Sequence, residues 1–158
     1  MSWWSDFWTT VGSEFSDLPS VVQVTRVSTR LVLASVYGGV LGYERQFKGK
    51  TAGVQTHMLV ALGAALFVII PQEAGVSKGD VSRVLQGLIA GVGFLGAGAI
   101  AKANEHEIRG LNTAAVIWLT AAIGVAAGMG QQASAALSTV VALVILTLIP
   151  KVVRSHPH

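Results

Sequence analysis

The longest uncharged stretch of the chain limits its possible folds more than any other feature of the sequence. Residues 110–150 contain no Asp, Glu, Lys or Arg. At about 1.5 Å per residue, a single helix of this length would extend roughly 60 Å, twice the hydrocarbon core of a bilayer, which is about 30 Å thick. A break rich in glycine and glutamine at residues 128–132 divides the stretch. We therefore predict two transmembrane helices here, residues 111–127 and 133–150.

Three further segments, residues 24–43, 55–71 and 84–101, come close to the run of about 20 mainly apolar residues that a crossing needs. Of the 158 residues, 52% are hydrophobic and only 12% are charged, whereas a soluble domain carries about 25% charged residues. The predicted fold class is an all-α integral membrane protein, a bundle of five transmembrane helices in the lipid bilayer. This domain covers residues 24–150, and residues 151–158 form a short cytoplasmic tail.

The N-terminal segment, residues 1–23, is rich in aromatic residues, including Trp3, Trp4 and Trp8. It lacks the basic start and the apolar stretch of a signal peptide, so we expect no cleaved signal. Tryptophan at this density favours a segment that lies at the headgroup level of the membrane. The alternative is a frayed tail.

The lysines and arginines predict the orientation, because cytoplasmic loops are enriched in them. With five crossings, the side of the C-terminus receives Arg45, Lys48, Lys50, Lys102, Arg109, Lys151 and Arg154, and the other side receives Arg26, Arg30, Lys78 and Arg83. We expect the C-terminus in the cytoplasm and the N-terminus outside. Since these residues lie between apolar runs and do not gather on one face, we expect no nucleic-acid partner. The absence of cysteine excludes disulfides and thiolate metal sites.

Glycines at helical spacing predict the packing surfaces. Residues 91–98 contain the letters GxGxxG, but a dinucleotide site needs a preceding strand and a following helix, and neither is expected inside a spanning segment. Small residues at such spacing let helix backbones approach closely in lipid, which indicates a tight bundle or a homodimer. The predicted packing residues are Gly38, Gly42, Gly87, Gly91, Gly93, Gly96, Gly98, Gly124 and Gly128.

Ionisable side chains near membrane depth are costly and usually face protein or water, which makes them functional candidates. Arg30 lies one turn from Arg26 on the same helix face, and the pair needs an acidic partner, a lipid phosphate or water. The alternative is snorkelling to the outer headgroups. Asp80 and Arg83 stand at spacing i, i+3, where they form either a helix cap with a surface ion pair or, together with Gln86, a polar lining.

A second group of candidates lies at the predicted cytoplasmic helix ends, where Glu44 and Arg45 close one helix and Thr56 and His57 open the next. Adjacent residues on a helix point apart, so we expect Glu44 and Arg45 not to pair with each other. His57 either changes charge near neutral pH or acts as a structural hydrogen bonder.

The start of the fourth predicted helix contributes the last candidates, Arg109, Asn112, Thr113 and Trp118. Asn112 and Thr113 either cap this helix or satisfy polar groups on a neighbouring one.

The motifs GYER at residues 42–45, GKTAG at 49–53 and THMLVALG at 56–63 follow one another in this order. Residues 80–83, residues 91–98 with Ile100, and residues 109–118 running into 122–124 continue the pattern. In these motifs, over residues 26–150, the chain resembles the MgtC/SapB family of bacterial membrane proteins.

The resemblance implies a multi-pass inner-membrane protein of stress and low-magnesium adaptation, from a family linked in pathogens to survival inside macrophages. Members were first named for magnesium transport, whereas inhibition of the F-type ATP synthase has been proposed instead, which makes that enzyme an expected partner. Gln55 stands where many members have Arg, and Asn112 where Thr is common. The chain stops at His158, so we expect a short form without the ACT-like domain of the virulence-factor members.

Three classes of function remain open. We favour a non-enzymatic regulator that acts as a dimer on membrane energetics or on a partner membrane protein. The alternative is a small channel or transporter for magnesium, protons or anions, with a polar path lined by Arg30, Asp80, Arg83, Gln86, Glu44, Arg45 and His57. An enzyme is least favoured, because no nucleophile with a base, paired carboxylates or metal triad stands at usable spacing. We expect no cofactor.

Overall fold

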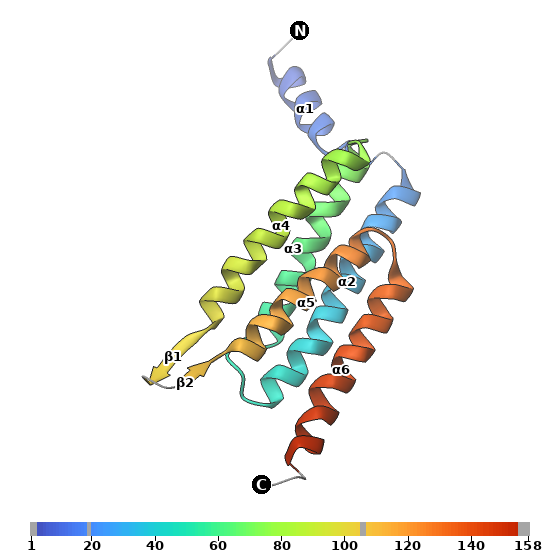
Figure 1. Ribbon diagram of the computed structural model, residues 1–158. Coiled ribbons are helices and arrows are strands. Elements are labelled where there is room, and N and C mark those ends of the chain that lie inside the picture. The colour runs from blue at the N-terminus through green and yellow to red at the C-terminus, as the bar shows by residue number, and fades with distance from the viewer. Residues whose placement is uncertain (1–2, 19, 105–106, 155–158) are drawn as a thin grey trace.

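The computed structural model describes residues 3–18, 20–104 and 107–154. Its elements in chain order are α1 (Trp3–Glu14), α2 (Val21–Phe47), α3 (Val54–Glu73), α4 (Lys78–Ala99), β1 (Ala101–Asn104), β2 (Glu107–Arg109), α5 (Leu111–Gly128) and α6 (Gln132–Arg154). The five long helices α2 to α6 run up and down beside one another (Figure 1). Each predicted spanning segment therefore coincides with one helix.

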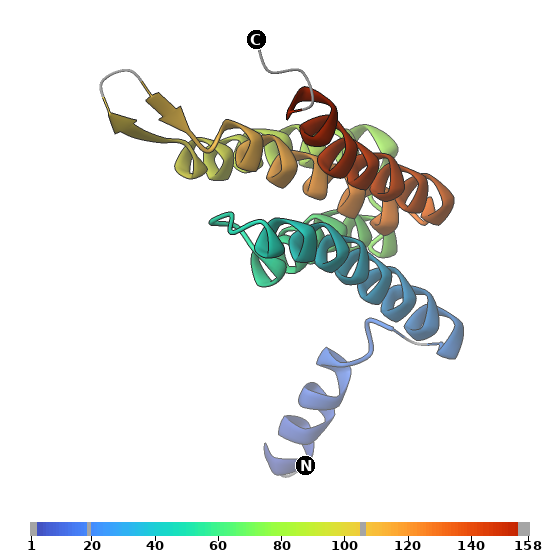
Figure 2. The ribbon, with the colours of Figure 1, turned by 90° about the horizontal axis from the view of Figure 1, so that it is seen from below.

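The five helices form two layers, with α2 and α3 in one and α4, α5 and α6 in the other (Figure 2). Helices α2, α3 and α5 make the most extensive contacts with one another, so they form the centre of the bundle. Helix α4 packs mainly on α5, and α6 packs on both α2 and α5. From α2 onward, each helix packs against the next helix in the sequence.

Small residues allow the central helices to approach closely. A Cβ atom added to Gly42 would lie 2.6 Å from the Cα of Val54, and one added to Gly128 would lie 2.7 Å from the carbonyl oxygen of Ala65. Gly38 and Gly124 lie equally close to the backbone of α3. In lipid, where hydrophobic burial does not drive helix association, such close contact is a main source of stability.

The sequence predicts the glycines of α4 as packing residues, but most of them do not contact another helix of this chain. Gly87, Gly91, Gly93 and Gly98 have nothing within 4 Å of an added Cβ, and only Gly96 faces a neighbour, the Cβ of Ala114 at 3.6 Å. The reason is that α4 turns the side with Val81, Val92 and Gly96 toward the bundle. Within this chain, the predicted packing surface of α4 is therefore mostly open.

Four helices, α3 to α6, are long and apolar enough to cross a membrane. Helix α2 is not among them, because Thr25, Arg26, Ser28, Thr29 and Arg30 make its first half polar. The chain is thus a predominantly helical membrane protein with several apolar spans.

The strand pair β1–β2 and the helical form of the N-terminal segment were not predicted from the sequence. Strands β1 and β2 pair in antiparallel fashion, and Ala101 lies opposite Arg109 and Lys102 opposite Ile108. The N-terminal aromatic residues form helix α1, which has no buried residue and stands apart from the bundle (Figures 1 and 2). Residues 1–2 and 19 of the N-terminal segment and residues 155–158 of the predicted tail lie outside the described residues.

Candidate functional site

The C-terminal turn of α2 carries a charged cluster inside the protein. The carboxylate of Glu44 lies 2.5 Å from the Lys48 ammonium and 3.7 Å from Nη1 of Arg45. Glu44 is 9% exposed and Arg45 only 2%. The expectation that Glu44 and Arg45 do not pair was wrong. Although the two residues leave the helix in different directions, the long arginine side chain bends back, and in a buried setting the carboxylate is its nearest counter-charge.

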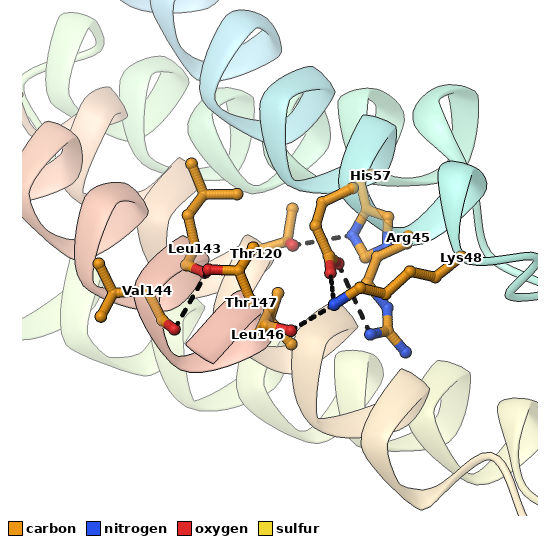
Figure 3. A network of polar contacts seen from close by, with 9 residues as sticks. Arg45, Lys48, His57, Thr120, Leu143, Val144, Leu146 and Thr147 are labelled. Atoms are coloured by element: carbon orange, nitrogen blue, oxygen red, sulfur yellow. Dashed lines mark hydrogen bonds and ion pairs between the residues drawn. The ribbon is translucent and has the colours of Figure 1, made fainter. Parts of the chain in front are cut away.

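Lys48 links this cluster to the last helix. Its ammonium also donates a hydrogen bond to the carbonyl oxygen of Leu146 on α6 (Figure 3). A buried Glu44 without Lys48 and Arg45 would be an unpaired charge, which is far more costly than a pair. The cluster therefore joins α2 to α6 through charge-assisted hydrogen bonding.

His57 lies in the core on α3 and is fully buried. Its Nδ1 is 2.9 Å from Oγ1 of Thr120 on α5, as Figure 3 shows. The same hydroxyl also bonds to the carbonyl oxygen of Val116 at 2.8 Å, and the tautomer of the ring decides whether Nδ1 donates or accepts. This contact favours the structural interpretation of His57. Nε2 of His57 has no hydrogen-bond partner among the described residues.

Two cavities of about 620 and 390 Å³ open at the same end of the bundle and share Arg45, Lys50 and Asn112 as lining residues. We call them together the basic pocket. Its charged lining residues are Arg45, Lys48, Lys50, Arg109 and Lys151. No carboxylate lines it in the part of the chain whose side chains the structure describes. Its described charged lining residues are all basic, and the carboxylate of Glu44 lies close to Arg45 and Lys48.

Arg45 is incompletely satisfied within the protein. Its Nε and Nη2 are buried and have no hydrogen-bond partner among the described residues. A buried donor left without a partner costs about 1–3 kcal/mol, and more when the group is charged. The arrangement can therefore accept an anionic group from outside the chain.

Arg30 lies at the opposite end of α2 and serves a different set of contacts. Its Nη1 donates to the carbonyl oxygen of Gly128, at 2.9 Å, and to Oε1 of Gln72, at 3.2 Å. The positive guanidinium thus binds the last turn of α5, where the helix dipole is negative. Arg30 links α2 to α3 and α5 through a backbone carbonyl and a side-chain amide, and none of its hydrogen-bond partners among the described residues is an acid.

Asp80 and Arg83 pair locally at 3.1 Å, and both are exposed. Ser77 accepts a hydrogen bond from the backbone N–H of Asp80 at 3.2 Å and so caps α4. Gln86 is exposed as well. These positions match the cap and surface ion pair, and exposed pairs of this kind contribute only about 0–1 kcal/mol.

The remaining candidates gather at the end that holds the basic pocket. Arg109, Asn112 and Thr113 line it, whereas Thr56 is exposed on α3 and the Trp118 side chain is half exposed on α5. Gly110, in a left-handed conformation with φ 95°, is the N-cap of α5, and no side chain caps that helix. Neither Asn112 nor Thr113 is therefore the cap.

Several residues of this site were not singled out from the sequence: Lys48, Lys50, Thr120 and Lys151. The role of Lys48 could have been predicted, because it stands at i+4 from Glu44, a spacing at which opposite charges pair on a helix. No sequence pattern predicts the roles of Thr120, Lys50 and Lys151, because these roles depend on which helices become neighbours. No group of three potential His, Cys, Asp or Glu metal ligands occurs among the described residues.

An apolar region separates the two polar ends. Arg30 and Arg45 are fifteen positions apart on one helix, which corresponds to about 22 Å. Between them the core contains mostly apolar side chains with little or no exposure: Ala34, Leu41, Ala61, Ala65, Ile69, Ile123 and Ala127. The structure thus brings Glu44, Arg45 and His57 together but keeps Arg30, Asp80 and Arg83 apart from them.

Comparison with known proteins identifies one family. Residues 31–155 match the model of the MgtC family. The chain is 43% identical over 123 residues to "Protein MgtC" of Brucella abortus (strain 2308), a match that covers 77% of this chain and 50% of that protein. It is 44% identical over 119 residues to "Protein SrpB" of Synechococcus elongatus, covering 66% of this chain and 64% of that protein.

A third relative is the "Putative magnesium transporter YhiD" of Escherichia coli (strain K12), 41% identical over 127 residues, with 74% of this chain and 57% of that protein covered. The chain therefore spans about half to two thirds of the length of these curated relatives. No solved structure matches the chain.

Proposed function

Since the chain belongs to the MgtC family, we propose that it acts as a non-enzymatic regulator in the bacterial inner membrane, where it modulates a partner membrane protein or membrane energetics. The setting would be stress and low-magnesium adaptation, as the family resemblance implies. The observation that supports this role is the separation of the two polar ends by an apolar core. A single chain built in this way presents charged surfaces at both membrane faces but offers no continuous polar path between them.

In this proposal α2 is the fifth span. It lies against α3 and α5 over its length, and its polar first half is partly shielded, since Arg30 binds Gln72 and Gly128. With five crossings, the basic pocket and the loop at residues 48–53 face the cytoplasm, in agreement with the enrichment of positive residues on that side. Helix α1, with its exposed tryptophans, would lie at the outer headgroups.

The surface that would meet a partner is the open face of α4. Gly87, Gly91 and Gly98 leave its backbone accessible. Gly87 and Gly91 line a cavity of about 380 Å³ together with Phe67 and Leu95 among others. Small residues on an exposed helix face suit close packing against another helix in lipid. The candidates are a second copy of this chain and a partner such as the F-type ATP synthase.

The test of the regulator role uses cells grown at low magnesium. Deletion of the gene is expected to change membrane potential and cellular ATP, and crosslinking in native membranes is expected to recover a second membrane protein. A Gly91→Ile variant should lose that crosslink, whereas Gly12→Ile, on α1 outside the bundle, should keep it. Self-contacts alone, together with unchanged potential and ATP, would contradict the proposal.

A second candidate function is ion transport. Buried charges in a membrane protein often mark an ion path, and one relative carries the name of a putative magnesium transporter. Against a magnesium path stands the charge of the basic pocket, because five cationic residues repel a divalent cation. Flux measurements in liposomes separate the two functions.

A further inference from the structure

We propose that the basic pocket binds a phosphate group, supplied by the headgroup of an anionic phospholipid. This inference does not depend on the regulator role. It rests on the side chains of the pocket, on the helix end that opens into it, and on its position in the bundle.

The first argument is the orientation of Arg45. The guanidinium is 2% exposed and lines both cavities of the basic pocket. Its Nη1 faces Glu44, while Nε and Nη2 have no partner among the described residues. These two nitrogens form one edge of the planar group, the edge that binds two oxygens of a phosphate side by side. In Figure 3 the guanidinium points away from His57.

The second argument is the beginning of α5. Its N-cap is Gly110, which provides no side-chain cap, so the first backbone N–H groups, including those of Asn112 and Thr113, have no acceptor from a cap residue. Gly110, Asn112 and Thr113 all line the larger cavity. A helix start of this kind attracts an anion through its free N–H groups and its dipole. It lies in the same cavity as the unpartnered edge of Arg45.

The third argument concerns the source of the phosphate. Leu146 and Pro150 of α6 line the smaller cavity together with Lys48 and Lys151. The neighbouring residues Leu148 and Ile149 are more than half exposed, which places this wall beside lipid chains. Because the pocket lies at the ends of α2, α5 and α6, it is at the depth of the headgroups. Basic pockets between helices at this depth suit anionic lipids, whose chains can follow the apolar wall.

The experiment uses the full chain in nanodiscs of defined composition. Native mass spectrometry would count the lipids retained after transfer from mixed phosphatidylglycerol and phosphatidylcholine nanodiscs. The wild-type chain is expected to retain phosphatidylglycerol in preference. The Lys50→Gln and Lys151→Gln variants, which alter exposed residues at the rim, should each reduce that preference about fivefold. Lys78→Gln, an exposed lysine at the opposite end, is the matched control and should leave it unchanged.

A separate arm titrates sodium phosphate into the chain in pure phosphatidylcholine nanodiscs. Equal retention of the two lipids by the wild-type chain, or equal loss in Lys50→Gln and Lys78→Gln, would overturn the proposal. Saturable binding of inorganic phosphate without any lipid preference would overturn the lipid as its source. Arg45→Gln should abolish the preference, but because that residue is buried, the conclusion is drawn from the rim variants.

Discussion

At the scale of single residues, the polar groups inside this bundle differ in how far the chain itself satisfies them. Arg30 finds acceptors on α3 and α5, and Nδ1 of His57 bonds to Thr120 on α5. Arg45 keeps two buried donors without a partner among the described residues. This difference separates groups that hold the fold together from a group that is available to a ligand.

The contact between His57 and Thr120 is expected to stabilise the bundle. Thr120→Val keeps the shape of the side chain but removes the hydrogen-bond partner of the buried Nδ1 of His57, so the free energy of unfolding should fall by about 1–3 kcal/mol. The matched control is Thr139→Val, because Thr139 is also buried and its hydroxyl bonds only to Ala135 of its own helix. Unfolding in mixed detergent micelles measures the free energy of unfolding of the two variants. Equal losses in the two variants would contradict the role given to His57.

At the scale of helices, the glycines fall into two groups that had looked alike in the sequence. Gly124 meets the backbone of α3, where an added Cβ would lie 2.8 Å from the Cα of Ala61, whereas Gly87 faces open space. The spacing of the glycines does not distinguish the two groups, because Gly124 and Gly128 stand four residues apart and so do Gly87 and Gly91. Only the direction in which α4 packs on α5 decides which glycines are covered.

A pair of alanine substitutions tests this distinction. Gly124→Ala should destabilise the monomer by about 1–3 kcal/mol, because the methyl group overpacks a backbone contact. Gly87→Ala should be neutral or stabilising by up to about 1 kcal/mol, because alanine is the better helix former. Thermal unfolding in dilute detergent gives both values. If the two substitutions had the same sign and size, the assigned helix packing would be wrong.

At the scale of the whole molecule, the sequence predicted the helices better than it predicted their contacts. The charge-free residues 110–150 and the break at residues 128–132 located α5 and α6, because apolar length is a direct requirement of the bilayer. The strand pair β1–β2 was missed, since strands of four and three residues are too short to give a clear periodic pattern in the sequence. The hydrogen bond from Lys48 to Leu146 could not be predicted from the sequence either, because it joins residues 98 positions apart.

The orientation and the fifth span are tested together by single cysteines, which the natural chain lacks. If α2 crosses the membrane, Ser20→Cys and Lys78→Cys should both react with an impermeant maleimide added to intact spheroplasts. Lys151→Cys should react only after permeabilisation. If Ser20→Cys were protected while Lys78→Cys reacted, α2 would not be a span. Labelling of Lys151→Cys in intact cells would reverse the proposed orientation.

The most direct test of the regulator role is ion flux through the purified chain. The full chain would be placed in liposomes that contain a magnesium-sensitive or pH-sensitive dye, with a known channel measured in parallel. Because an apolar core separates Arg30 from the basic pocket, the account predicts magnesium, proton and anion flux equal to that of protein-free liposomes. Flux above that level, abolished by Arg30→Gln or by Lys50→Gln, would contradict it.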